Sequence, residues 1–293
     1  YDPAVSPPPI FDPSFNATIT GDVTSTGFIA IGAGGNAYFR AGSNVVSDNG
    51  LAVRTGDDII IESGASLTAA NNPSTSPDAS STFTNPGNLI LQAGDFTGLF
   101  GSPIGTLGTT PLTPIASIVA AGDLDANGFA VVMTANAVDG LGGTITASSI
   151  SVDINDAPPT GTGQIDDNGL LSAQCLQGNV CLGTLNADNL VYIGRASNND
   201  VIQAIIESGT VSANDILVTT RRDIVMGTTG IATVLDASNQ FIVESTEGNV
   251  DLRNASISST SILISAVNGS LLGSGSLTSD SDIGITVAAP AAS

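Results

Sequence analysis

The sequence predicts an all-β protein, a right-handed parallel β-helix (β-solenoid) of about eleven coils with two loop insertions. Three observations support this fold. A short apolar motif returns about every 20 to 26 residues, the intervening runs are rich in β-branched residues, and the turns are rich in Gly and Asn. A βαβ unit needs about 30 residues or more, so this period is too short for one but suits a coil with two or three strands.

The repeated motif is an apolar residue, four small or polar residues, and a second apolar residue that opens a strand. The regular copies are Val23-TSTG-Phe28, Val46-SDNG-Leu51, Leu124-DANG-Phe129, Ile145-TASS-Ile150, Ile165-DDNG-Leu170, Leu185-NADN-Leu190, Val211-SAND-Ile216 and Ile257-SSTS-Ile262. Leu235-DASNQ-Phe241 and Leu277-TSDSD-Ile283 carry one extra residue, and a long insertion splits the copy that begins at Leu67 and resumes at Leu89. A β-sandwich is the alternative fold, but its strands do not keep a fixed apolar spacing.

Alternation and β-branching predict strands within each period, most clearly at residues 29–31, 59–61, 216–219 and 262–264. Residues 199–207 are the only helix-like stretch, and their β-branched content favours a strand. Turns such as DNG, ANG and SGAS supply Gly and Asn where positive φ is needed. Eleven coils at about 4.8 Å each would give a rod of about 50 Å.

We expect one solenoid domain at residues 17–289, preceded by an arm at 1–16 and followed by a tail at 290–293. The arm is Pro-rich and should run extended, because Pro cannot join a central strand. Residues 70–88 and 95–115 lack the motif and are predicted to be loop insertions. Insertions in solenoids project from one face, often the binding face. These two either fold back over the core or form an exposed contact patch.

The charge balance argues against two classes of partner. The chain has 27 acidic residues, six Arg, no Lys and no His, giving a net charge of −21. Such a chain repels the phosphates of nucleic acids and anionic membrane surfaces. No apolar run approaches the roughly 18 residues of a membrane-spanning helix. The chain begins at Tyr1 without signal-peptide features, so we expect a processed or excised segment from which any signal peptide has already been removed.

Cys175 and Cys181 are the two cysteines of the chain, and the motif spacing places both in a turn between coils. A disulfide that closes a small surface loop is expected in an oxidising compartment, stabilising the fold by about 2 kcal/mol. The alternative is a metal pair. Two Cys without His or further Cys make a poor zinc site, so the disulfide is favoured.

Acidic side chains provide the candidate metal site. Asp123, Asp125 and Asn127 match the start of an EF-hand calcium loop, although its last position is occupied by Thr134 instead of Glu. The same residues also fit a β-turn of the repeat. Calcium is therefore a candidate ligand, and no other cofactor is expected. Further acidic groups at coil edges are Asp57 with Asp58, Asp153 with Asp156, and Asp166 with Asp167.

A polysaccharide-degrading enzyme is the catalytic alternative for a β-helix. Glycoside hydrolysis needs two carboxylates a few ångströms apart, and Asp153 and Asp156 near Asp166 and Asp167 are the candidates. The chain has no Trp, only three Tyr and no His, so it lacks sugar-stacking platforms and the commonest acid–base side chain. The sequence therefore favours a protein that is not an enzyme.

The coils Gly183-TLNADNLVYIG, Gly209-TVSANDILVTT and Ala255-SISSTSILISAV resemble the haemagglutinin-type repeats of filamentous-haemagglutinin-like bacterial exoproteins and adhesins. The resemblance covers about residues 17–289. It implies a right-handed β-helix, export to the bacterial cell surface or the extracellular space, and an adhesive or structural role. The family's Asn-Pro-Asn-type secretion signature is not matched, since the nearest phrase has Gly87 in place of the second Asn.

The function expected from these observations is an extracellular structural or adhesive solenoid that assembles head-to-tail into a filament or matrix. No capping helix is visible at either end, and uncapped coils expose strand edges that invite stacking. The partners would be further copies of the chain or cell-surface and matrix components. The expected assembly contacts are Tyr1, Pro7, Pro8, Pro9, Phe11, Phe83, Phe96, Leu99 and Phe100. A monomeric carbohydrate-binding adhesin rod is the main alternative.

Overall fold

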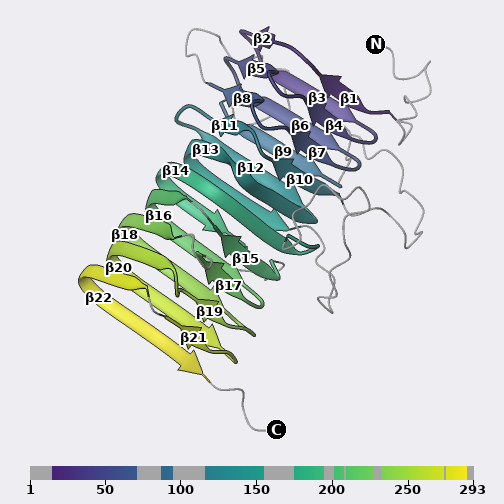
Figure 1. The fold of residues 1–293 in the computed structure, drawn as a ribbon. Helices are drawn as coiled ribbons and strands as arrows, with labels where there is room; N and C mark the ends of the chain where they lie inside the picture. Colours follow the sequence, from purple (N-terminus) through teal and green to yellow (C-terminus); the bar gives the residue numbers. More distant parts are fainter. Residues whose placement is uncertain are drawn as a thin grey trace, which may run out of the picture.

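The structure is a computed structural model that describes residues 15–70, 87–94, 116–154, 175–194, 201–207, 209–227, 232–273 and 275–288. Every regular element in these residues is a β-strand, and the strands join one continuous parallel sheet. The sheet winds into a rod, with β1 (Ala17–Ile19) at one end and β22 (Ser276–Ala288) at the other (Figure 1). The predicted all-β parallel solenoid is therefore confirmed. No helix in the described segments is long and apolar enough to cross a membrane.

Each coil passes through three faces of the rod, and strands of one face stack on each other from coil to coil. The first face contains β1, β4 (Ala37–Phe39), β7 (Ile59–Ile61), β10 (Ser117–Ala120), the starts of β13 (Ala137–Ile154) and β14 (Asn179–Ile193), β15 (Gln203–Ile206), β17 (Ile224–Met226), β19 (Val250–Asp251) and β21 (Leu271–Leu272).

The second and third faces are formed by short strands in the early coils and by single long strands in the later ones. The second face contains β2 (Val23–Ser25), β5 (Asn44–Ser47), β8 (Ser66–Ala69), β11 (Asp123–Asp125), the middle of β13 and β14, and the starts of β16 (Thr210–Thr220), β18 (Thr233–Ser245), β20 (Ala255–Val267) and β22. The third face contains β3 (Ile29–Ala33), β6 (Leu51–Thr55), β9 (Leu89–Ala93), β12 (Ala130–Ala135) and the ends of the long strands.

One column of inward side chains on the second face contains one residue from each coil and so shows the number of coils. Its members, each paired with the next, are Val23, Val45, Leu67, Leu124, Ile145, Leu185, Val211, Leu235, Ile257 and Leu277. These ten positions mark ten stacked coils joined by nine steps, which is about nine full turns and fewer than the eleven coils predicted. The split copy is confirmed, because Leu67 and Leu89 occupy successive faces of one coil between the same neighbours.

The copy predicted at 165–170 lies in the segment 155–174, which is outside the described residues. In the described stack, Ile145 in β13 pairs directly with Leu185 in β14. Two strands that pair edge to edge leave no place for a third strand between them, so the inward column passes from Ile145 to Leu185.

The predicted register of the second coil is wrong by one residue. Val45, not Val46, pairs with Val23 and Leu67, and its side chain is fully buried. Neighbouring residues of a strand point to opposite sides, so a one-residue slip exchanges core and surface. Two successive valines fit either register by hydrophobicity alone, which explains the error.

The motif predicts four residues between the inward positions of the second and third faces, and this spacing holds in only some of the coils. Ile29 and Val131 occupy the inward column of the third face, whereas Phe28 and Phe129 beside them are half-buried. Coils with spacers of different length pair through register shifts at the corner, for example between Ala147 and Ser149. These β-bulges let coils of unequal length share one core.

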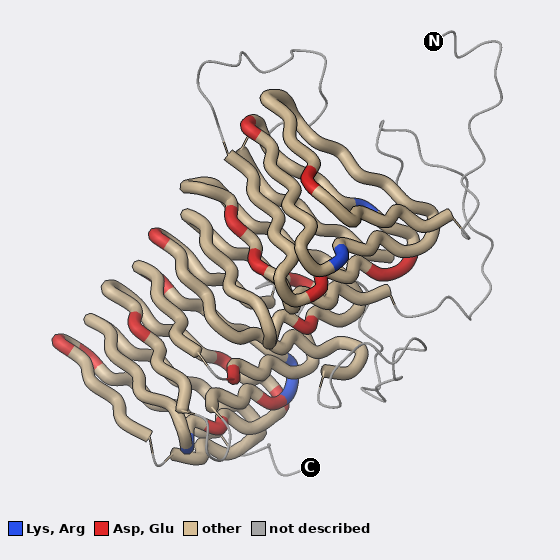
Figure 2. The backbone as a smooth tube through the Cα atoms, turned by 45° about the horizontal axis from the view of Figure 1, so that its top comes forward, with Lys and Arg blue, Asp and Glu red and all other residues tan. Residues whose placement is uncertain are grey.

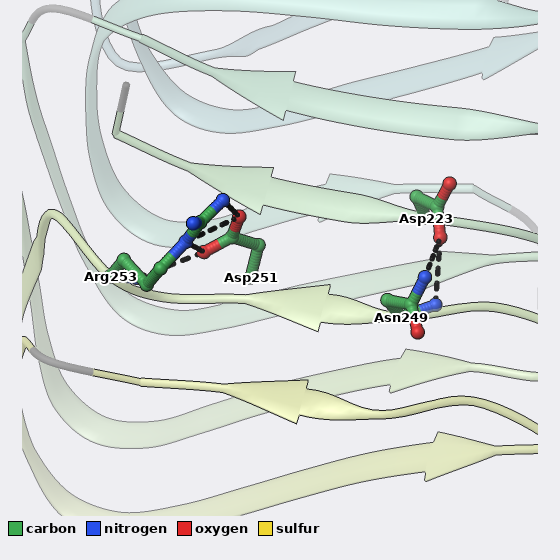
Figure 3. Close-up of polar contacts among 4 residues, drawn as sticks. All are labelled: Asp223, Asn249, Asp251 and Arg253. Carbon is green, nitrogen blue, oxygen red and sulfur yellow. Dashed lines mark hydrogen bonds and ion pairs between the residues drawn. The ribbon is translucent and has the colours of Figure 1, made fainter. Parts of the chain in front are cut away.

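A column of Asn and Asp side chains fastens successive coils at the corner that leads into the first face. Asn36 Oδ1 accepts a hydrogen bond from the backbone N–H of Asp58, at 2.8 Å. Asp58 Oδ1 in turn accepts one from the N–H of Ser117, also at 2.8 Å. The same relay joins Asp223 to Asn249 further along the rod (Figure 3). Asn249 is joined in turn to Ser270. Each side chain thus satisfies a backbone donor that lies at a corner, outside the regular ladder.

Candidate functional site

The last coil, made of β21 and β22, leaves its inward apolar side chains open to solvent. Ile262 and Ile264 of the preceding coil are 1% and 0% exposed. Ile283 and Ile285 continue the same columns, yet they are 48% and 50% exposed. Val287, which pairs with buried Ala266, is 52% exposed. These are core side chains by position, and they are uncovered because no described coil lies beyond them.

The same coil presents a long unpaired strand edge. Within the described residues, β21 pairs with β19 and β22 pairs with β20, and neither pairs on its other side. β22 runs for 13 residues without Pro, Lys or Arg. Natural proteins blunt exposed edges with such residues or cover them, because an open edge is a template for pairing with another chain.

The first coil, made of β1, β2 and β3, presents the opposite edge at the other end of the rod (Figure 1). Of its inward residues, Ala17, Val23 and Ile31 are half-buried, and Ile29 is 9% exposed. All strands are parallel, so the two ends expose complementary backbone edges and not copies of the same edge. A contact between one end and the other would be heterologous and would leave both outer ends free.

No family model, curated protein or solved structure matches the chain. Of the predicted resemblance to haemagglutinin-type repeats, the structure supports the stack of parallel coils.

The calcium candidates Asp123, Asp125 and Asn127 help to form the backbone turn of the repeat. Asp125 Oδ1 accepts a hydrogen bond from the N–H of Asn127 at 2.7 Å, and Asn127 has a φ of 39°. Asp123 Oδ1 accepts one from the N–H of Thr144 in the next coil at 3.1 Å. The three residues form the turn that the repeat predicted. In the parts of the chain that the structure describes, no three His, Cys, Asp or Glu side chains are grouped to hold a metal ion.

A shallow groove of about 270 Å³ lies on the second face next to this turn. The polar side chains that line it are Asp125, Asn127, Thr146, Asn186, Asp188 and Ser212. Asn127 lies in the turn after β11, and the others come from four neighbouring strands, β11, β13, β14 and β16. The same lining contains no aromatic side chain. Its hydroxyl, amide and carboxylate groups are suited to hydrogen bonding with a polar ligand, without a ring for a sugar to stack on.

Of the four catalytic candidates, the structure describes Asp153. It lies on the third face, where its Oδ1 accepts a hydrogen bond from the N–H of Ile154 at 2.9 Å. Asp156, Asp166 and Asp167 lie outside the described residues. Asp58, predicted as an acidic group at a coil edge, is fully buried and belongs to the corner column.

Cys175 and Cys181 form a disulfide, with their Cα atoms 5.9 Å apart. Its surroundings differ from the expected surface turn, because both side chains are fully buried and Cys181 lies within β14. Together with Ile205 they form a small apolar cluster separate from the main core. Val180 and Leu182, on either side of Cys181, point into that core, so Cys181 points to the outside of the first face. The disulfide therefore holds Cys175 against the outside of this face.

Carboxylates are spread along the whole rod instead of gathering in one patch (Figure 2). Two of them have lowered pKa values. Hydrogen bonds from the N–H of Ala41 and the guanidinium of Arg40 lower the pKa of Glu62. A hydrogen bond from the guanidinium of Arg253 lowers the pKa of Asp251 and raises that of Arg253. The Arg40–Glu62 and Arg253–Asp251 pairs lie on or near the surface, and each helps to hold a turn in place.

The predicted assembly contacts Tyr1, Pro7, Pro8, Pro9, Phe11, Phe83, Phe96, Leu99 and Phe100 lie outside the described residues, as do nearly all of the arm, both insertions and the tail. The exposed apolar side chains that the sequence did not single out are Ile283, Ile285 and Val287. Their motif copy was recognised, but a repeat pattern looks the same in every coil. Only the position of a coil in the stack shows that its core residues are uncovered.

Proposed function

We propose that the protein is a structural or adhesive solenoid of the bacterial cell surface or extracellular matrix, and that its rods stack head-to-tail into filaments. The observation that carries the proposal is the open last coil. Its core side chains are about half exposed, and its strand edge is unpaired in the described structure. Covering both at once requires a coil of matching shape, and the first coil of another copy has that shape. The secreted location rests on the resemblance of the repeats.

The chemistry of the rod also suits this role. The net charge of −21 keeps rods apart sideways, because like charges along their flanks repel. At the end of the rod, apolar burial and backbone pairing favour contact. End-to-end growth is then preferred over lateral clumping, which gives an extended filament instead of an amorphous aggregate.

The test is electron microscopy and sedimentation of the full chain, with Ile283→Asp as the disrupting variant. Wild type should form filaments with an axial repeat of about 50 Å, the height of ten coils at 4.7–4.9 Å each. Ile283→Asp should remain as single rods, because it places a charge in the buried contact. Circular dichroism and thermal unfolding establish that the variant is folded.

The matched control is Leu263→Asp. Leu263 is 44% exposed, close to the 48% of Ile283, but its neighbour Ile262 is a buried core residue, so Leu263 faces the side of the rod. Filaments should form as in wild type. If Leu263→Asp blocks assembly while Ile283→Asp does not, the rods associate through their flanks. Single rods of wild-type protein at all concentrations would contradict assembly altogether.

A second candidate is a monomeric rod that binds carbohydrate, and the polar groove beside Asp125 favours it. A glycan array compares wild type with Asn186→Ala and Asp188→Ala. Binding that both substitutions weaken would locate the ligand in the groove. An array without signal above background argues against this role.

A further inference from the structure

We propose the register of the head-to-tail contact: Ile283 of one copy lies on Ile29 of the next, with Leu277 on Val23 and Leu271 on Ala17. Each residue of the last coil thus lies on a residue of the first coil of the second copy whose number is lower by 254. This inference rests on the proposed head-to-tail function and specifies its interface. Four features of the two coils agree on it.

The first feature is the spacing of the inward columns. In the first coil the column positions are 17, 23, 29 and 31, and in the last coil they are 271, 277, 283 and 285. Both coils therefore have steps of six, six and two residues. The coil before the last has positions 250, 257, 262 and 264, with steps of seven, five and two. Neighbours with unequal steps pair through a register shift, as between Ser259 and Ser261, whereas the first and last coils match without one.

The second feature is sequence identity at the matched positions. Gly21, Thr24, Ser25, Ile29 and Ile31 meet Gly275, Thr278, Ser279, Ile283 and Ile285. The matched serines also build the same turn. The N–H of Gly27 donates to Ser25 Oγ at 3.1 Å, and the N–H of Ser281 donates to Ser279 Oγ at 3.3 Å. Two turns of the same construction are expected to stack closely.

The third feature is a serine column that joins successive coils at this turn. Ser47 Oγ donates to the carbonyl of Gly27 in the preceding coil at 2.7 Å. Ser279 Oγ donates in the same way to the carbonyl of Thr260 at 2.8 Å. Ser25 belongs to this column, since it pairs with Ser47, but no described coil precedes it. In the proposed register the 280–282 turn of the other copy supplies a carbonyl in the equivalent place.

The fourth feature is the corner column of Asn and Asp. Asn249 Oδ1 accepts from the N–H of Ser270 at 2.9 Å, and Asn16 Oδ1 accepts from the N–H of Asn36 at 2.8 Å. Asn16 and Ser270 are also 254 residues apart. The side chain of Ser270 would therefore lie where it can accept from the N–H of Asn16 in the next copy. The relay that joins coils within one rod would then continue from one rod to the next.

The charges allow this register. Asp22 of one copy meets Ser276 of the other, and Asp280 and Asp282 meet Thr26 and Phe28. No carboxylate lies directly on another, which matters because like charges opposite each other in paired strands are destabilising. A one-residue slip would turn Ile283 and Ile285 from the core to the surface, so sliding is opposed by the loss of apolar burial.

The test is disulfide cross-linking of the full chain carrying both Thr24→Cys and Thr278→Cys. The two threonines are exposed on the second face and would lie directly opposite each other across the interface. Paired strands are 4.7–4.9 Å apart, within the Cα separation of about 4.4–6.8 Å that a disulfide accepts. Mild oxidation should give a ladder of covalent oligomers on a non-reducing gel, which disappears on reduction. The native cysteines are buried and bonded to each other, so they do not take part.

The control carries Asp22→Cys with Thr278→Cys, a register shifted by two residues. Its Cα atoms would be about 8 Å apart, beyond the reach of a disulfide, so at least about tenfold less covalent oligomer is expected. Stronger cross-linking of the control overturns the register. Electron microscopy of the reduced proteins separates the two claims. Filaments without cross-links at positions 24 and 278 overturn the register alone, whereas absence of both filaments and cross-links overturns head-to-tail assembly as well.

Discussion

Asp223 and Asn249, one coil apart, are joined by two hydrogen bonds to a single carboxylate oxygen. Asp223 Oδ1 accepts from the backbone N–H of Asn249 at 2.8 Å and from its side-chain Nδ2 at 3.0 Å (Figure 3). Asn249 is also an acceptor, because its own Oδ1 accepts a hydrogen bond from the N–H of Ser270 in the next coil. One side chain thus links three coils at the corner where regular strand pairing is interrupted.

Replacing Asn249 by Ala should lower the free energy of unfolding by about 1–2 kcal/mol. The substitution removes the bond from Nδ2 and leaves the N–H of Ser270 without its acceptor, and each such loss costs about 1 kcal/mol. Denaturant unfolding measures the change. Asn189→Ala is the control, because Asn189 is exposed and its Nδ2 bonds only the hydroxyl of Ser148 among described residues. An equal effect of the two substitutions would contradict the role of the corner column.

Phe241→Ala should destabilise the rod far more, by about 3–5 kcal/mol. Phe241 is fully buried in the inward column of the third face, between Ile216 and Ile262. Its removal leaves a cavity that the neighbouring coils cannot close without breaking strand pairing. Leu263→Ala serves as the surface comparison, since that side chain is 44% exposed, and a loss below about 1 kcal/mol is expected. Thermal unfolding of both variants decides the matter.

The repeat predicted the class of fold because a column of buried apolar residues leaves its period in the sequence. Leu124, Ile145 and Ile257, for example, were assigned to the inward column and occupy it. Exact register was harder. Val45 and Val46 are chemically equal, and only pairing with Val23 decides which one is buried.

The interface residues could not be predicted from the motif for a related reason. Ile283 and Ile262 have the same place in the repeat, and a local pattern contains no information about how many coils lie above it. Exposure at the end of a stack is a property of the whole chain. What the sequence does contain is the equal spacing of the first and last coils, with Ile29 and Ile31 matched by Ile283 and Ile285.

Gly194→Ala should destabilise the fold by about 3 kcal/mol, from backbone strain together with a steric clash. Gly194 has a φ of +96°, and a Cβ there would lie 2.2 Å from the carbonyl oxygen of Thr219 in the next coil. Gly42 separates the two effects. Its φ is +80°, but no atom lies within 4 Å of an added Cβ, so Gly42→Ala should cost only about 1–2 kcal/mol. Equal losses in denaturant unfolding would show that close coil packing does not constrain Gly194.

Removing the Cys175–Cys181 disulfide should destabilise the protein by about 2 kcal/mol, the value expected for so short a closed loop. The double variant Cys175→Ser, Cys181→Ser tests this by thermal unfolding. Mass spectrometry after alkylation in denaturant without a reductant should find no free thiol in wild type. Because both sulfurs are buried beside Ile205, reduction should require partial unfolding. Rapid reduction of the folded protein by a mild thiol would contradict that burial.

The pairing of Asp251 with Arg253 makes a defined contribution to the pH dependence of stability. Hydrogen bonds from Arg253 hold the pKa of Asp251 below its ordinary value in the folded protein. The carboxylate therefore stabilises the fold at neutral pH, and this contribution is lost as the pH falls from about 5 through the lowered pKa. The raised pKa of Arg253 acts only at strongly alkaline pH, where its stabilising effect would be lost as the pH rises.

Asp251→Asn should accordingly lower stability at pH 7 by less than about 1 kcal/mol, because the arginine is exposed and water screens the pair. The difference between Asp251→Asn and wild type should shrink from about pH 5 downward and also in high salt. Asp236→Asn is the control, since Asp236 is exposed on the second face and forms no ion pair with any described residue. Thermal unfolding from pH 3 to 7 measures both variants. A difference for Asp251→Asn that stayed constant over this range would show that the ion pair does not stabilise the turn.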